Sequence, residues 1–319
     1  MKNCLRLTIA LSLLTCGGAL AMLVETPDDV LDAGAELIAT GRVISVASGW
    51  NADYTRIMTD VVFEVSGFDK GSAEARVVIR VPGGEVDDIG MLVEDTPVFE
   101  PGDVVTLRLE PTSEPSVFRL HGAANAVVGR EGLDKKPEKP GGRKPPKLYS
   151  YSGFHREPAS CYYEVNQGVA GWLDAIQASN ATWDAAGSVF RFYYDGTTTA
   201  TGPTYDGTNV VTAANLGSGG ILAQNTYWYL RKGKLVLEND IVFNSYYDWS
   251  TSGEPSKYDV QNICTHEMGH CLVLNDMYTS LAAEQTMYGY AGLGETKKRT
   301  LEQGDKDGIL RIYGAAADN

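Results

Sequence analysis

Positive charge and long apolar runs are both in short supply in this chain. It has 27 Lys and Arg against 41 Asp and Glu among 319 residues, which gives a formal net charge of −14 at pH 7. Such an excess of acid argues against nucleic acid or an anionic membrane surface as a partner. Beyond the N-terminus no stretch approaches the roughly 18 apolar residues that a membrane span requires. We therefore expect a soluble monomer of two domains without a membrane span.

The first 21 residues have the pattern of a signal peptide. Lys2 and Arg6 precede an apolar run over residues 7–14, and Ala19-Leu20-Ala21 provides a cleavage site with small residues. We expect cleavage after Ala21 and export, to the extracellular space or the periplasm. Cys16 offers a minor alternative, a lipid anchor, but the two residues before it suit that modification poorly.

Cysteine is also sparse once the signal peptide is removed. Cys161, Cys264 and Cys271 would remain, and an odd number leaves at least one thiol unpaired. On one helix Cys264 and Cys271 would lie about 10 Å apart along the axis, beyond the reach of a disulfide. Any bridge must therefore involve Cys161, and buried free thiols are the alternative.

Two of only four histidines fall within one short motif, Thr265-His266-Glu267-Met268-Gly269-His270. On a helix His266 and His270 share a face and can bind one Zn²⁺, with Glu267 beside them and Asp276 six residues further on. Three protein ligands leave zinc a position for water, from which Glu267 would take a proton as general base. Ser256 is a suitable N-cap, so we predict a helix over about residues 256–274.

From about Cys161 to Gly314 the chain resembles the metzincin clan of zinc endopeptidases, and within it the matrixins. Asp276 stands at the third-ligand position, as in the snapalysin-like members, and Met287 lies in a segment similar to the methionine turn. Residues 300–314 resemble the final matrixin helix, where Thr300 and Gln303 can form a capping box. The resemblance implies an α+β catalytic domain with a mixed, twisted sheet and a zinc site of His266, His270 and Asp276. It also implies a substrate cleft along an unpaired edge strand, by analogy residues 221–229, to which a protein or peptide substrate would add.

The chain departs from the family pattern at Val273, which occupies the glycine position where the zinc helix ends. A β-branched residue is costly at positive φ. Either the turn is made differently, perhaps around Asn275, or the helix continues and Asp276 is displaced. In the latter case Glu284 or Glu295 would be the third ligand.

Other family features are missing or weakly indicated. The histidine loop that holds a second zinc in animal matrixins is absent, and no cysteine lies in residues 22–160 to serve as the inhibitory thiolate of their propeptides. Calcium at the loops of Asp195 and Asp206 has only weak support.

The domain organisation follows from changes in composition. Residues 1–21 form the signal peptide, 22–130 an all-β barrel or sandwich, 131–157 a linker rich in Pro, Lys and Gly, 158–314 the matrixin-like domain, and 315–319 a tail. The linker is either a plain tether or a processing site. We read residues 82–88 as a solvated hairpin loop. The predicted strands of the first domain are 36–46, 59–65, 75–81, 104–109 and 116–120. The matrixin-like domain is predicted to contain strands at 162–165, 188–194, 220–230 and 235–243 and a helix at 169–186.

These patterns favour a secreted zinc metalloendopeptidase. A catalytically silent binding module of the same fold is the alternative, and it would require a broken motif, whereas Glu267 and both histidines are present. A structural or inhibitory protein with an incidental zinc has no support in the sequence.

Overall fold

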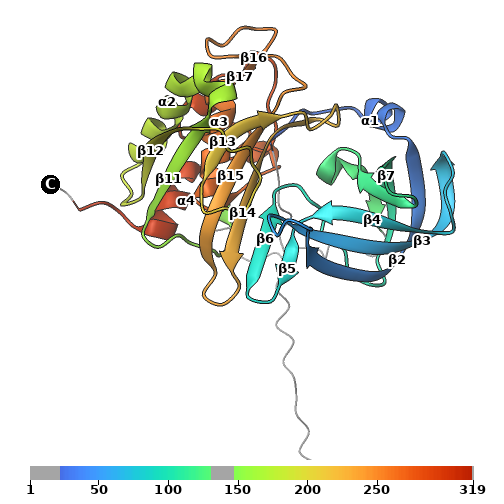
Figure 1. The fold of residues 1–319 in the computed structure, drawn as a ribbon. Coiled ribbons are helices and arrows are strands. Elements are labelled where there is room, and N and C mark those ends of the chain that lie inside the picture. Colours follow the sequence, from blue (N-terminus) through green and yellow to red (C-terminus); the bar gives the residue numbers. More distant parts are fainter. Residues whose placement is uncertain (1–21, 131–146, 318–319) are drawn as a thin grey trace, which may run out of the picture.

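The computed structural model describes residues 22–130 and 147–317, which form two bodies, each with its own core (Figure 1). The predicted signal peptide, with Cys16, and residues 131–146 of the predicted linker lie outside the described residues. No helix within the two described ranges is long and apolar enough to cross a membrane.

The first body is a closed β-barrel. Its strands are β2 (Leu37–Trp50), β3 (Ile57–Lys70), β4 (Arg76–Pro82), β7 (Val104–Pro111), β8 (Val117–Leu120) and β9 (Val127–Arg130). They pair in the order β2-β3-β4-β8-β7, β7 pairs back onto β2 to close the ring, and β9 adds to β7. A short helix, α1 (Asp28–Gly34), precedes the barrel, and a 3-10 turn, η1 (Ala123–Ala126), precedes β9. The sequence left barrel and sandwich open, and the structure has the barrel.

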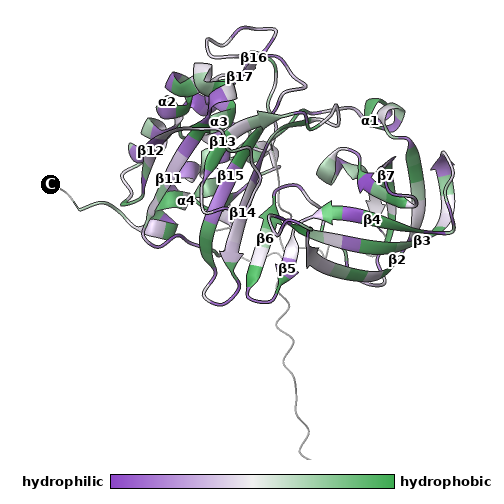
Figure 2. Cartoon of the chain, viewed as in Figure 1, coloured by the Kyte–Doolittle hydropathy of each residue, from purple (hydrophilic) through white to green (hydrophobic). Residues whose placement is uncertain are grey.

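Alternation along the strands explains the barrel core. In β4 the side chains of Val77, Ile79 and Val81 are buried, and those between them are partly exposed. Successive strand residues point to opposite faces, and β-branched residues suit such a half-buried surface. Figure 2 shows the result as hydrophobic and hydrophilic bands that alternate along β3 and β4.

The second body contains a mixed sheet in the order β12-β11-β13-β15-β14, which confirms the α+β class predicted for this half. Its strands are β11 (Ser160–Asn166), β12 (Arg191–Thr198), β13 (Val210–Ala214), β14 (Ile221–Leu230) and β15 (Leu235–Asn244). Neighbouring strands from β12 to β15 are parallel, whereas β14 is antiparallel to β15. Among these five strands β14 alone runs antiparallel to its neighbour.

Three helices pack with this sheet, and Figure 1 shows α3 and α4 behind it. They are α2 (Leu173–Asp184), which follows the 3-10 turn η2 (Gln167–Trp172), α3 (Val260–Cys271) and α4 (Gln303–Tyr313). Ile176 and Trp183 of α2 are buried, as their spacing predicts, and the indole N–H of Trp183 donates to the Thr265 carbonyl on α3 at 2.7 Å. This contact fixes α3, which carries His266, Glu267 and His270, against α2.

Short elements complete the second body. They are β10 (Ser150–Tyr151), which pairs with β18 (Leu274–Asn275), β16 (Trp249–Ser250), which pairs with β17 (Tyr258–Asp259), and the 3-10 turns η3 (Ser280–Ala282) and η4 (Lys297–Arg299). Residues 147–157, which composition assigned to the linker, pack against this body, since Ser152 N–H donates to the Val273 carbonyl at 3.1 Å. Ala316, in the predicted tail, donates its N–H to the Gly187 carbonyl.

A hairpin of the N-terminal half joins the sheet of the second body (Figure 1). It consists of β5 (Gly84–Val86) and β6 (Ile89–Val93), and β6 pairs antiparallel with β14, with Val93 opposite Thr226. The hairpin predicted over residues 82–88 is present and its turn is exposed, but the prediction missed that its strands extend this sheet. The strand β1 (Met22–Leu23) also pairs with β14, opposite Ala223 and Ile221. The edge over residues 221–229 is thus covered, which contradicts the prediction of an unpaired substrate edge.

Candidate metal centre

Helix α3 brings the two motif histidines together. Asp259, and not the predicted Ser256, is its N-cap, because the Asp259 carboxylate accepts the Asn262 N–H at 2.9 Å. The rings of His266 and His270 are fully buried, and their Nε2 atoms lie 3.0 Å apart. One turn of helix therefore aims both imidazoles at the same point.

The turn that follows the helix is made at Val273. Helix α3 ends at Cys271, and Val273 adopts the left-handed conformation with φ of 64° that usually selects glycine at this position. Neither alternative considered for the sequence occurs, since the helix does not continue and the turn does not shift to Asn275. The chain reverses, and Asp276 Oδ1 comes within 2.9 Å of His266 Nε2, while its Oδ2 is 3.5 Å from His270 Nε2.

Backbone carbonyls fix the tautomer of both rings. His266 Nδ1 lies 2.7 Å from the Thr286 carbonyl, and His270 Nδ1 lies 2.8 Å from the Leu274 carbonyl. A carbonyl oxygen can only accept, so each neutral ring carries its hydrogen on Nδ1 and turns the Nε2 lone pair toward Asp276.

An arrangement of acceptors alone is unfavourable unless a cation sits among them. The ligand atoms of His266, His270 and Asp276 all lie within 4.8 Å of one another, and neither carboxylate oxygen of Asp276 has a hydrogen-bond partner among the described residues. Two imidazole nitrogens and a carboxylate, with carbonyls behind the rings, match a zinc site. The donor set thus fits the metal that the motif predicts.

The methionine turn supports α3 from below. Met287 is 1 % exposed, and a Cβ placed on Gly269 would lie 2.2 Å from its sulfur, so this contact requires glycine on the helix. Asp305 of α4 holds the turn, because its carboxylate accepts the N–H groups of Thr286 at 2.8 Å and Met287 at 3.1 Å. Sequence reasoning gave no role to Asp305, although its place at the start of α4 was visible.

Asp305 also accepts the N–H of Glu302 at 3.0 Å, and these two residues form the capping box of α4. The box predicted for Thr300 and Gln303 is therefore wrong, although the helix itself is present. One carboxylate thus ties the last helix to the turn beneath the candidate metal centre.

A third carboxylate, Glu94, reaches the centre from the N-terminal half. Its Oε2 lies 2.8 Å from His270 Nε2, and the ligand atoms of Glu94, Glu267 and His270 lie within 4.8 Å of one another. Glu94 follows β6 directly, and the pairing of β6 with β14 brings it to this position. No motif surrounds Glu94 in the sequence, so local pattern could not identify it.

Burial and like charges shape the acid-base state of these carboxyls. Burial raises the pKa of Glu267 to about 8, against the opposing effect of His270. It also raises the pKa of Glu94 well above its usual range. Burial acts in the same direction on Asp276, but the two adjacent histidines outweigh it and lower that pKa. Three carboxyls in one buried place must be neutralised by protons or by a cation.

The other sequence candidates lie elsewhere. Glu284 is on the surface, where it meets Lys297 at 3.6 Å, and Glu295 accepts from Lys298 at 2.7 Å. Neither belongs to a group of metal-ligating side chains in the described part of the chain, and the same holds for Asp195 and Asp206, the weak calcium candidates.

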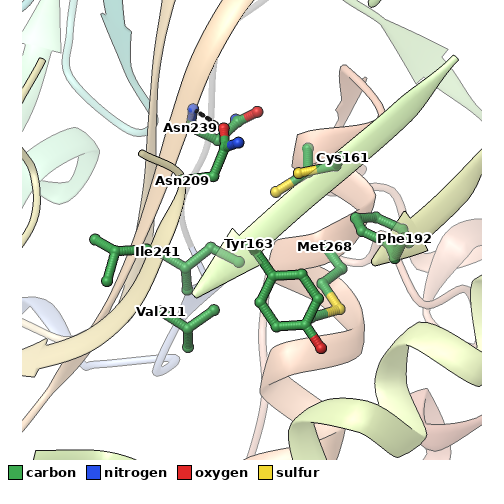
Figure 3. Close-up of a pocket in the computed structure, with 10 residues that line it drawn as sticks. Cys161, Tyr163, Phe192, Asn209, Val211, Asn239, Ile241 and Met268 are labelled. Atoms are coloured by element: carbon green, nitrogen blue, oxygen red, sulfur yellow. Dashed lines mark hydrogen bonds between the residues drawn. The ribbon is translucent and has the colours of Figure 1, made fainter. Parts of the chain in front are cut away.

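The three cysteines are free and buried. Cys161 on β11 lines a small apolar cavity with Met268 (Figure 3). A hydrogen bond with the Cys271 thiol lowers the pKa of Cys161 to about 7. Arg156, buried nearby, donates to the Cys271 carbonyl at 3.3 Å and places a positive charge at the C-terminal end of α3. The prediction of buried, unpaired thiols is confirmed for the residues that the structure describes.

With this geometry established, comparison with known proteins relates part of the second body to a known family. Residues 208–314 match the sequence model of the matrixin family. This segment is similar to the matrixins. It runs from just before β13 to the end of α4 and so includes α3, the turn at Val273 and the methionine turn. The match supports a zinc metallopeptidase type of function for the matrixin-like segment. No protein of known function matched the chain in a search of curated sequences.

Proposed function

We propose that this protein is an exported zinc endopeptidase whose metal is held by His266, His270 and Asp276. The observation that carries the proposal is the convergence of their acceptor atoms, with Glu267 adjacent on the same helix. The signal-peptide pattern of residues 1–21 supports export, and the fold supports a protein or peptide as substrate.

The residues divide the chemistry between them. When bound, zinc supplies a Lewis acid that polarises the scissile carbonyl and makes water more acidic. Glu267 accepts a proton from the attacking water and returns it to the leaving nitrogen, so that water and a peptide bond become a carboxylic acid and an amine. His266 and His270 keep their orientation through the Thr286 and Leu274 carbonyls, and the buried setting of Glu267 favours a carboxyl that can both accept and return a proton.

A catalytically silent binding module is the less favoured function. It would tolerate loss of the base or of a histidine, and the structure brings His266, Glu267 and His270 together in one buried group. Neither calcium nor a second zinc is included in the proposal.

Replacement of Glu267 by Gln tests the mechanism. We expect Glu267→Gln to retain one zinc per chain, by elemental analysis, while casein hydrolysis falls by about 10²-fold or more with loss of the base. His266→Ala is the matched control and should lose the metal as well. Because Glu94 lies in the buried group and β6 pairs with β14, the comparison is made in the Met91→Asp/Glu94→Gln chain, in which both should be displaced. Unchanged turnover in a zinc-loaded Glu267→Gln protein would remove Glu267 from the mechanism.

A further inference from the structure

The outer edge of β14 is covered by the chain's own N-terminal half. Val93 to Ile89 of β6 lie opposite Thr226 to Leu230, and β1 lies opposite Ala223 and Ile221. Between these strands the Glu94 N–H donates to the Asn225 carbonyl at 3.1 Å. Both β6 and β1 run antiparallel to β14, so they use the backbone groups through which an extended peptide would bind.

The hairpin that supplies β6 is tightly docked. Glu85 pairs with Arg231 at 2.7 Å and accepts the Tyr229 hydroxyl at 3.0 Å. Gly90 allows close contact, because a Cβ there would lie 2.1 Å from the Tyr229 ring. Met91 and Val93 are buried in a small cluster with Trp228 of β14 and Ile57 of β3, which is distinct from the main barrel core. Ion pair, hydrogen bond and apolar packing therefore all hold β6 against the matrixin-like body.

Docking of β6 carries Glu94 into the candidate metal centre. Glu94 is 4 % exposed, and its Oε2 lies 2.8 Å from His270 Nε2 without a hydrogen bond of normal geometry. With the His270 ring neutral and its hydrogen on Nδ1, Nε2 and the Glu94 oxygen are both acceptors, which is the arrangement expected when both face one cation. The whole group is closed, since none of its members is more than 5 % exposed. A peptide could not reach Glu267 in this arrangement.

We propose that Glu94 is a fourth ligand of the metal and that β6 with Glu94 forms an inhibitory segment that keeps the enzyme latent. The proposal rests on the proposed function and adds a built-in inhibitor to it. The Glu94 carboxylate takes the coordination position that water needs, and β6 takes the edge that substrate needs. Activation then requires β6 to leave β14. No thiol takes part, in agreement with the absence of cysteine from residues 22–160.

Metal binding tests the ligand without reference to activity. Zinc affinity of the full chain is measured by competition with a chromophoric chelator for the wild type, Glu94→Gln and Glu100→Gln. Glu100 is an exposed glutamate of the same body and serves as the matched control. Loss of groups that only support ligands costs about 10–100-fold in affinity, so Glu94→Gln should cost at least about tenfold. Glu100→Gln should match the wild type. Equal zinc affinity of all three proteins would overturn the ligand assignment.

The visible spectrum of the cobalt-substituted protein shows whether the metal has a coordination position open to an added ligand. We expect acetohydroxamate to change the visible spectrum of the Glu94→Gln protein and to leave that of the wild type unchanged at the same concentration. A wild-type spectrum that responds equally would show that the position is already open, and it would contradict latency.

Hydrolysis distinguishes the inhibitory segment from the function itself. Met91→Asp places a charge in the small cluster of Met91, Val93, Trp228 and Ile57 and should release β6 from β14. We expect casein hydrolysis by the Met91→Asp/Glu94→Gln chain to exceed that of the zinc-loaded wild type. Full activity in the zinc-loaded wild type would refute the inhibitory segment. Zinc binding with no hydrolysis by any variant would refute the peptidase function, and the affinity result for Glu94 would still stand.

Discussion

Val273 provides a direct test of whether backbone strain is present at the turn that delivers Asp276. A residue other than glycine in the left-handed conformation loses roughly 1–2 kcal/mol. In an ordinary conformation Ala is more stable than Gly by roughly 0.5–1 kcal/mol, because glycine loses more backbone freedom on folding. At Val273 the strain should exceed this entropic cost. The Val273→Gly variant should therefore be more stable than Val273→Ala, by roughly 0.5–1 kcal/mol.

Val236 supplies the matched control, since it lies in the same buried cluster but in strand β15. Both valines are nearly inaccessible, at 1 % and 5 % exposed, so truncation removes similar packing at each position. Val236→Gly should be less stable than Val236→Ala by roughly 0.5–1 kcal/mol, the usual order. Urea denaturation followed by tryptophan fluorescence measures all four variants through their midpoints. If the Gly variant is less stable than the Ala variant at both positions, the claim that Val273 is strained is refuted.

The remaining predictions concern the metal and pH. Asp276→Ala should weaken zinc binding at least about tenfold, whereas Glu295→Ala should leave it unchanged, as measured by chelator competition. Weaker zinc binding in Glu295→Ala together with unchanged binding in Asp276→Ala would contradict the assignment of Asp276 as the third ligand. On strand β15, burial raises the pKa of Asp240 to about 8, so the folded protein holds a proton that the unfolded chain releases near pH 4. This contribution is complete below about pH 4 and is lost as pH rises to about 8. The melting temperature should therefore fall less between pH 5 and 8 in Asp240→Asn than in the wild type, and equal slopes would contradict the assignment.

Much of the second body could be predicted because its signals are local. Alternation and apolar runs located β11, β14 and β15, and the motif located α3. The ends of α3 could not be predicted from local pattern. Ser256 is a residue type favoured at N-caps, but Asp259 is the cap and also pairs with Arg299, forty residues away in sequence. Ser and Asp are about equally favoured as N-caps, so local propensity could not decide between the two positions.

The geometry of Val273 was beyond sequence reasoning for a related reason. The cost of positive φ was visible, and it argued for a different turn. The structure accepts that cost because the surroundings determine the conformation: the Val273 N–H donates to the His270 carbonyl at 2.8 Å, and its side chain is buried with Tyr227. Strain of this kind persists where several contacts over-determine a residue.

The position of Glu94 depends on a pairing between strands more than 130 residues apart. Within the first half of the chain, β6 is a short apolar strand like others, and nothing local indicates which edge it joins. Sequence reasoning expected β14 to be free because the family resemblance concerned the catalytic half alone. The partner that covers this edge lies outside the matched segment, residues 208–314.

In the proposed latent state, the carboxylates of Asp276 and Glu94 together balance the two positive charges of the metal ion. A divalent cation held by two neutral imidazoles and two carboxylates, beside a protonated Glu267, has no net charge, and a neutral group can be buried at far less cost than an ion. With a histidine in place of Asp276, the same closed arrangement would retain one positive charge around His266 and His270, which are fully buried. When Glu94 leaves the site that contains Asp276, one positive charge also remains, but water then enters and solvates it. Charge neutralisation therefore adds to strand pairing in holding β6 on β14, and it gives a reason for an acidic third ligand in a chain whose residues 22–160 contain no cysteine.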